Sequence, residues 1–103
     1  MIKLLYIEDD EVDRKAFERF VAREKLPYDY VPVGSVSEGK SAFKCDTFDV
    51  VVADYLLGDG TALDLLETIQ ADVPFIVLTG KGDEQIAVQA MKAGASDYLI
   101  KDL

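Results

Sequence analysis

The sequence contains no histidine and one cysteine among its 103 residues. Without histidine, acid–base catalysis by imidazole and metal ligation by imidazole are both excluded. The lone Cys45 has no partner for an internal disulfide, which is typical of proteins in a reducing compartment. We therefore expect a cytoplasmic location, and we expect any metal chemistry to depend on oxygen ligands.

Basic residues and long apolar runs are also scarce. The chain has 11 lysines and arginines against 20 aspartates and glutamates, which gives a formal net charge of -9. This charge disfavours direct binding to nucleic acid or to an anionic membrane surface. No stretch approaches the ~18 consecutive apolar residues of a membrane span, and residues 1–5 lack the layout of a secretory signal. We predict no nucleic-acid partner and no membrane partner.

The chain does contain a regular alternation of apolar runs and helical patterns. A length of 103 residues favours one domain, residues 1–103. Short apolar runs bounded by polar turns predict strands. These predicted strands span residues 2–7, 28–33, 49–54, 75–79 and 96–100. The central run, residues 49–54, is typical of a strand that is buried on both faces and ends in a single carboxylate.

Amphipathic spacing predicts a helix between each pair of strands. The first spans residues 11–24, and the second follows Ser35, which has the capping-box spacing to Glu38. The third stops before Pro74. The fourth begins at Asp83 as a cap and ends at Gly94 as a left-handed cap. Its predicted inner face consists of Ile86, Ala87, Ala90 and Met91.

Strands that alternate with helices predict parallel crossovers and a doubly wound α/β sheet. The predicted order ends on a strand, whereas a sheet covered on both faces would have a further helix there. We therefore expect part of one sheet face to be uncovered, which favours self-association of two copies.

Side chains that carry chemistry stand at the ends of the predicted strands. Glu8 and Asp9 follow the first strand, Asp54 ends the third, Thr79 ends the fourth and Lys101 follows the fifth. Because the carboxyl ends of parallel strands meet at one edge of a sheet, we expect these groups to converge.

Such a pocket favours phosphoryl chemistry. Three neighbouring carboxylates repel one another, and a divalent cation relieves that repulsion. Oxygen ligands without histidine favour Mg²⁺, which pairs readily with phosphate oxygens. The carboxylate of Asp54 is then a candidate nucleophile that forms an acyl phosphate, with the metal and Lys101 offsetting charge on the phosphoryl oxygens.

Four motifs, found in order along nearly the whole chain, resemble those of one family. They are YIEDDE at residues 6–11, VADYLLGDG at 52–60, VLTG at 77–80 and AGASDYLIK at 93–101. Together they resemble the receiver domain of bacterial two-component response regulators. The resemblance implies a flavodoxin-like sheet of five parallel strands in the order 2-1-3-4-5, here lacking the family's final helix.

The same resemblance implies a role for each site residue. Asp54 would accept a phosphoryl group from a sensor histidine kinase or a phosphotransfer protein. Mg²⁺ would be bound by Asp9 and Asp54 directly, by Glu8 through water and by the backbone carbonyl of Leu56. The family often has proline where this chain has Gly58.

The remaining implied roles concern the phosphoryl oxygens and the conformational switch. Thr79 and Lys101 would bind the phosphoryl oxygens, and Tyr98 would swing inward as Thr79 moves toward them. The chain would then be a signalling module and not an enzyme, and an effector domain is an additional expected partner.

Several alternatives remain open on the sequence. Residues 8–11 are also typical of an acidic helix start, and Asp54 of a turn cap. A metal-dependent phosphatase would usually carry a second aspartate at the position of Leu56. A flavodoxin-like cofactor binder would need a phosphate loop rich in small residues where this chain has residues 8–11. A receiver-shaped scaffold that works without phosphorylation is the remaining alternative.

Overall fold

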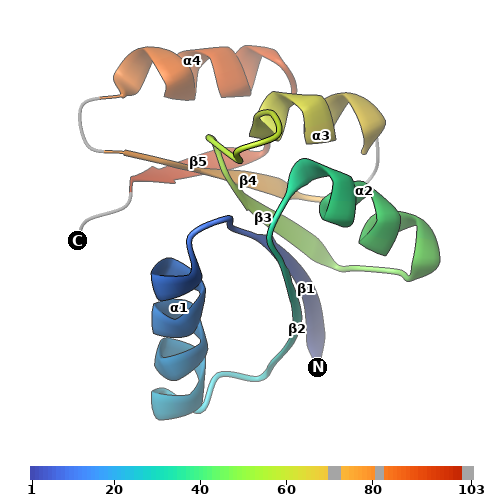
Figure 1. Ribbon diagram of the computed structural model, residues 1–103, viewed down its shortest axis with the longest axis vertical. Helices are drawn as coiled ribbons and strands as arrows, with labels where there is room; N and C mark the ends of the chain where they lie inside the picture. Colours follow the sequence, from blue (N-terminus) through green and yellow to red (C-terminus); the bar gives the residue numbers. More distant parts are fainter. Residues whose placement is uncertain (70–72, 81–82, 101–103) are drawn as a thin grey trace.

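The computed structural model describes residues 1–69, 73–80 and 83–100 and shows a twisted parallel sheet with helices on both faces (Figure 1). The sheet has five strands in the order β2-β1-β3-β4-β5, and each neighbouring pair is parallel. The strands are β1 (Ile2–Ile7), β2 (Tyr28–Val33), β3 (Val50–Asp54), β4 (Phe75–Thr79) and β5 (Asp97–Ile100). The predicted flavodoxin-like fold and its strand order are confirmed.

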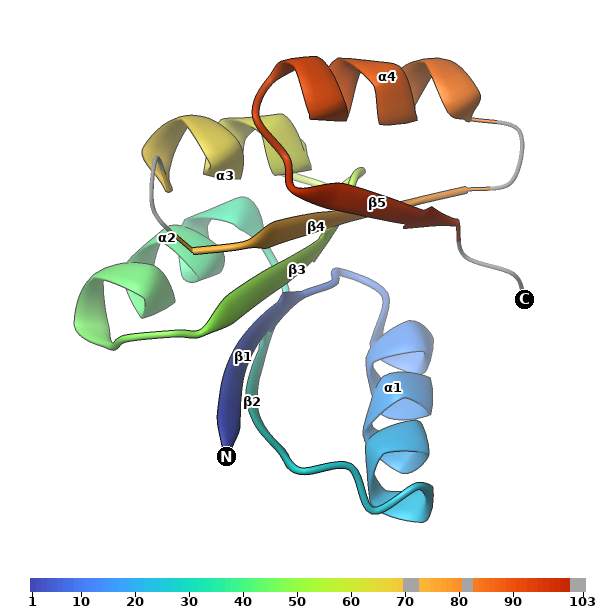
Figure 2. The same cartoon turned by 180° about the vertical axis from the view of Figure 1, so that it is seen from behind.

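The described residues form four helices, and they cover the sheet unequally. These are α1 (Glu11–Arg23), α2 (Val36–Cys45), α3 (Ala62–Thr68) and α4 (Glu84–Lys92). Figures 1 and 2 show α2, α3 and α4 on one face and α1 on the other. Among the described residues, none of the helices combines the length and the apolar character needed to cross a bilayer.

Helix caps agree with the sequence prediction in part. The Ser35 side chain accepts a hydrogen bond from the Glu38 amide at 3.0 Å, as predicted. The Glu38 carboxylate reaches back one residue further than expected and accepts from the Gly34 amide at 3.2 Å. A capping box that the sequence analysis missed, formed by Thr61 and Asp64, begins α3.

Two predictions for α4 are wrong. Asp83 is the N-cap residue, but its side chain makes no capping hydrogen bond. Its backbone, with φ -99° and ψ 44°, lies outside the extended region that capping residues typically adopt. Met91 is exposed, because the buried stripe of α4 runs through Ala87 and Ala90 and Met91 lies at the edge of that stripe. Gly94 has φ +111°, which confirms its left-handed conformation.

The main hydrophobic core lies between the sheet and the three helices α2, α3 and α4. β3 crosses its centre, with Val51 and Ala53 fully buried. A smaller cluster on the opposite face joins β1 and β3 to α1, where the rings of Tyr6 and Phe17 lie 4.3 Å apart.

An apolar groove of about 430 Å³ lies on the same face and is lined in part by residues of this smaller cluster. Its walls extend from Ile2 on β1, past Val52, Ile76 and Leu78, to Leu99 on β5. Among the described residues, α1 is the helix on this face, so the expected uncovered region of the sheet is present.

Candidate functional site

The acidic run at residues 8–11 is divided between two tasks. Glu8 and Asp9 continue from the end of β1 toward β3. The Asp10 carboxylate caps α1 and accepts from the Val12 amide at 2.8 Å, and Glu11 pairs with Lys15 at 3.1 Å. The interpretation as an acidic helix start is therefore confirmed for Asp10 and Glu11, while Glu8 and Asp9 lie beside β3.

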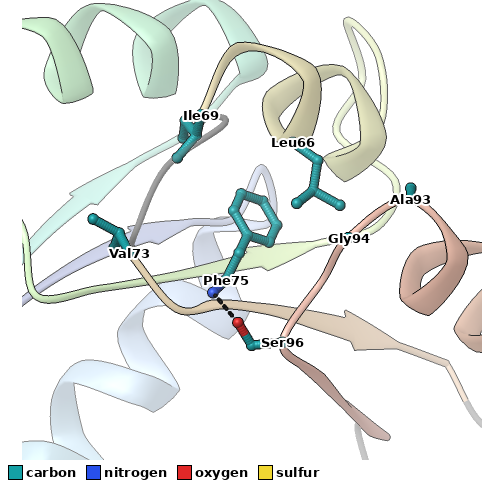
Figure 3. Close-up of a pocket in the computed structure, with 7 residues that line it drawn as sticks. All are labelled: Leu66, Ile69, Val73, Phe75, Ala93, Gly94 and Ser96. Carbon is teal, nitrogen blue, oxygen red and sulfur yellow. Dashed lines mark hydrogen bonds between the residues drawn. The ribbon is translucent and has the colours of Figure 1, made fainter.

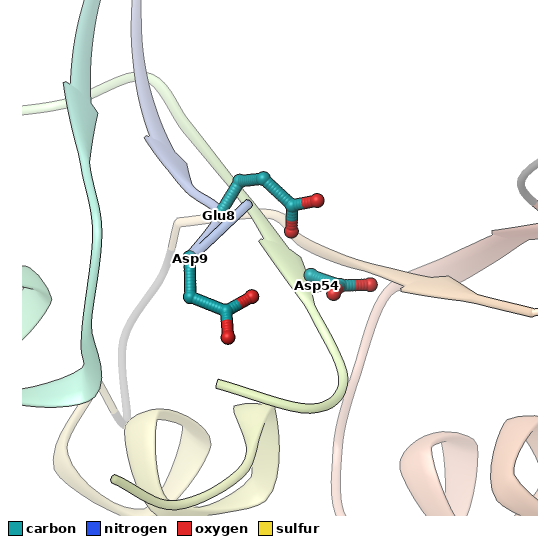
Figure 4. A group of neighbouring side chains, drawn as sticks. All are labelled: Glu8, Asp9 and Asp54. Atoms are coloured by element: carbon teal, nitrogen blue, oxygen red, sulfur yellow. The ribbon is translucent and has the colours of Figure 1, made fainter. Parts of the chain in front are cut away.

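Glu8, Asp9 and Asp54 form an acidic cluster at the carboxyl edge of the sheet (Figure 4). The register pairs Ile7 of β1 with Ala53 of β3, so the residues that follow each strand are neighbours. One carboxylate oxygen from each of the three residues lies within 4.8 Å of the other two. The predicted convergence of these acids is confirmed.

The acidic cluster fits a hard divalent cation. Glu8 is completely buried, Asp54 is half-buried and Asp9 is exposed. Carboxylates are rarely fully buried unless they are paired or bind a metal. Carboxylate oxygens are the ligands that Mg²⁺ prefers, and the exposed side of the cluster leaves room for the waters that this ion retains.

The loop after β3 lies against the acidic cluster. Leu56 forms an isolated bridge with Thr61, and the side chain of Leu56 is 67% exposed. Gly58 has φ +46°, and a Cβ atom there would lie 3.7 Å from Oδ2 of Asp9. Proline, whose φ is fixed near -65°, cannot adopt this conformation. The backbone of this loop therefore differs at position 58 from that of family members that have proline there.

Asp59 connects this loop to α2, and the sequence analysis missed that role. Its carboxylate accepts from the backbone amides of Val36 at 2.9 Å and Ser37 at 3.1 Å, the first two residues of the helix. These two donors, the Val36 amide first, hold the pKa of Asp59 below its usual value. An aspartate between two glycines predicts a turn, and nothing in the local sequence identifies a helix more than 20 residues away as its partner.

Thr79 and Tyr98 occupy the neighbouring strands. Thr79 ends β4 and is 2% exposed, one residue beyond Leu78, the partner of Asp54 in the register. Tyr98 on β5 is opposite Val77 and is 39% exposed. The remaining predicted site residue, Lys101, lies outside the described residues.

A hollow of about 220 Å³ opens beside the phosphoacceptor candidate. It extends from β3 to the start of α4, and it gives Asp54 access from outside. The residues that line it are Asp54, Tyr55, Leu56, Gly80, Asp83 and Ile86.

A second hollow, of about 210 Å³, lies at the opposite, amino-terminal edge of the sheet (Figure 3). Leu66, Phe75 and Ser96 are among the residues that line it. The Ser96 hydroxyl accepts from the Phe75 amide at 3.1 Å and so serves the junction of β4 and β5. This hollow brings together no charged groups among the described residues and is unrelated to the acidic cluster.

The strand order and the acidic cluster define a doubly wound α/β protein with its functional groups at the carboxyl edge of the sheet. Residues 4–103 match the family described as the response regulator receiver domain. The chain belongs to this family, whose members are modules of two-component signalling and not classical enzymes.

Curated relatives support the same assignment. The photosynthetic apparatus regulatory protein RegA of Rhodovulum sulfidophilum is 38% identical over 101 residues, which cover 95% of this chain and 54% of RegA. The acid tolerance regulatory protein ActR of Sinorhizobium medicae is 41% identical over 104 residues, with 96% and 52% covered. The chain spans about half the length of these two relatives, and only 13% of the methanogenesis regulatory protein FilR1 of Methanothrix harundinacea.

Solved structures share the fold. A response regulator receiver domain protein from Clostridium thermocellum superposes with a TM-score of 0.86 at 29% identity, covering 100% of this chain and 84% of that one. The non-phosphorylated HemR receiver domain from Leptospira biflexa gives a TM-score of 0.81 at 25% identity, with the same coverage.

The contact between Asp59 and α2 predicts a pH-dependent stability. Because the pKa of Asp59 is lowered in the folded state, its ionised form stabilises the fold above the unfolded pKa of about 3.9. That stabilisation is lost as the pH falls through the lowered, folded-state pKa. Asp59→Asn should therefore be less stable than wild type at neutral pH, and the difference should shrink below about pH 4.

Urea unfolding at a series of pH values measures this difference. The exposed, non-titrating change Thr47→Ala is the control, and its effect on stability should not vary with pH. An Asp59→Asn effect of equal size at all pH values would contradict the assignment.

Proposed function

We propose that the domain accepts a phosphoryl group on Asp54 from the phosphohistidine of a sensor histidine kinase or a phosphotransfer protein, in a reaction that requires Mg²⁺. The observation that carries this proposal is the acidic cluster, in which one carboxylate oxygen from each of Glu8, Asp9 and Asp54 lies within 4.8 Å of the other two. Family membership gives the reaction class.

The ligands of Mg²⁺ in this proposal are the carboxylates of Asp9 and Asp54, Glu8 through water, and the carbonyl of Leu56. An ion held by these residues would offset negative charge on the phosphoryl oxygens. A carboxylate oxygen of Asp54 attacks phosphorus, the bond from phosphorus to the imidazole nitrogen breaks, and that nitrogen takes the electron pair.

Thr79 and Lys101 would bind the phosphoryl oxygens. Thr79 ends the strand next to Asp54 and is buried, so its movement toward a phosphoryl group would leave space on the α4 side of the sheet. Tyr98, which is partly exposed on β5, would then turn inward and change the surface formed by α4 and β5.

The proposed setting is a cytoplasmic phosphorelay. RegA and ActR are both regulatory proteins that extend well beyond the matched region. An effector domain that reads the surface of α4 and β5 is therefore part of the proposal. We also propose that residues 1–103 form a single receiver domain.

The proposal predicts metal-dependent phosphorylation at one residue. Incubation with acetyl phosphate and Mg²⁺ should add one phosphoryl group, measured by intact-protein mass spectrometry. The addition should disappear in Asp54→Asn, which keeps the shape of the side chain and removes the nucleophilic charge. It should also disappear when Mg²⁺ is chelated.

A matched control is Asp64→Asn, an exposed carboxylate in the capping box of α3, which should be phosphorylated like wild type. Phosphorylation that persists in Asp54→Asn would contradict the assignment. If wild type is not phosphorylated under any of these conditions, the scaffold that works without phosphorylation is the better explanation.

We further propose that the apolar groove on the α1 face pairs two copies of the chain. Leu99 lines this groove and is 53% exposed, and Val88 on α4, on the other face, is 52% exposed. Leu99→Lys should therefore shift a dimer to monomer in light scattering, whereas Val88→Lys should not. A wild-type chain that is monomeric at all concentrations would contradict this pairing.

A further inference from the structure

Arg14 holds the turn that carries two of the acidic residues. This arginine lies on the first turns of α1 and is half-buried. Its Nη1 donates to the backbone carbonyl of Glu8 at 2.5 Å, and its backbone amide donates to the carbonyl of Asp10 at 3.0 Å. Asp9 therefore lies between two carbonyls that are fixed by the same residue.

The other side of this turn is fixed by β2. The backbone amide of Glu8 donates to the carbonyl of Val33 at 3.0 Å. The next residue, Gly34, lies against the Arg14 guanidinium, since a Cβ atom there would be 3.1 Å from Nη1. The absence of a side chain at position 34 thus gives the guanidinium the space in which it reaches the Glu8 carbonyl.

The positive charge of Arg14 and its hydrogen bond to the Glu8 carbonyl would affect cation binding in opposite directions. A guanidinium near three carboxylates repels Mg²⁺, so its removal should strengthen binding if charge were its whole contribution. A group that orients ligands instead weakens metal binding when it is removed, typically by about 10- to 100-fold. The sign of the change therefore separates the two roles.

We infer that Arg14 is a positioning residue for the metal site: through its bond to the Glu8 carbonyl it fixes the turn so that Glu8 and Asp9 face Asp54. This inference rests on the proposed Mg²⁺ site. Gly34 is part of the same arrangement, because the absence of a side chain there leaves space for the guanidinium of Arg14.

Isothermal titration with Mg²⁺ tests the inference without any phosphoryl donor. Arg14→Ala should weaken binding by about 10-fold, and Arg14→Lys should retain more affinity because it restores one donor. Gly34→Ala should also weaken binding, since a Cβ atom 3.1 Å from Nη1 pushes the guanidinium slightly away from the Glu8 carbonyl while all charges remain. In the Arg14→Ala background, Gly34→Ala should have no further effect.

The control is Arg19→Ala, which removes the same charge from an exposed position on α1 and should leave the affinity unchanged. Thermal unfolding of each variant is measured in parallel. A lower melting temperature with unchanged or tighter Mg²⁺ binding would overturn the positioning role and leave a purely structural arginine. If Arg14→Ala does not fold, Gly34→Ala decides in the same way.

Failure of the proposed function has a different signature. A wild-type chain that gives no heat of Mg²⁺ binding overturns both the metal site and the role of Arg14. Wild-type binding with unchanged affinity in Arg14→Ala and Gly34→Ala overturns the inference alone.

Discussion

Electrostatic repulsion among three carboxylates is the constraint on which this structure depends. The register of β1 and β3 brings one carboxylate oxygen from each of Glu8, Asp9 and Asp54 within 4.8 Å of the other two at one edge of the sheet. One of them, Glu8, is also removed from water, which is unfavourable for an ionised group. Such an arrangement is unfavourable for ionised groups, and the divalent cation of the proposed function would offset the repulsion.

The loops around the acidic cluster are held by contacts that come from a distance. Arg14 fixes the turn after β1 from the side of α1, and Asp59 fixes the loop after β3 by binding the amides that begin α2. Each loop is therefore attached to a helix that does not itself contribute a carboxylate to the cluster. Rigid support of this kind keeps the three acidic groups close together.

The strand order followed from the resemblance to the receiver family and not from the residue pattern. The pattern itself was sufficient for the convergence of the acids, because parallel strands end at one edge of the sheet and the third apolar strand runs directly into Asp54. The sequence was not sufficient to assign roles to neighbouring residues of the same charge. Residues 8–11 are all acidic, and only the structure shows which of them cap the helix. The sequence was also insufficient where a partner is remote, as for Asp59, or where loop geometry decides, as for the missing cap at Asp83. Lys101 lies outside the described residues, so its place in the pocket remains a prediction.

The most direct test of the central claim is the stability of wild type and Asp9→Asn with and without Mg²⁺. If repulsion within the acidic cluster is real, Asp9→Asn should be at least as stable as wild type without the ion. Added Mg²⁺ should raise the unfolding free energy of wild type, by about 2.7 kcal/mol at a hundredfold excess over the dissociation constant, and should raise that of the variant much less. Wild-type stability that does not respond to Mg²⁺, or an equal response in both proteins, would contradict the account.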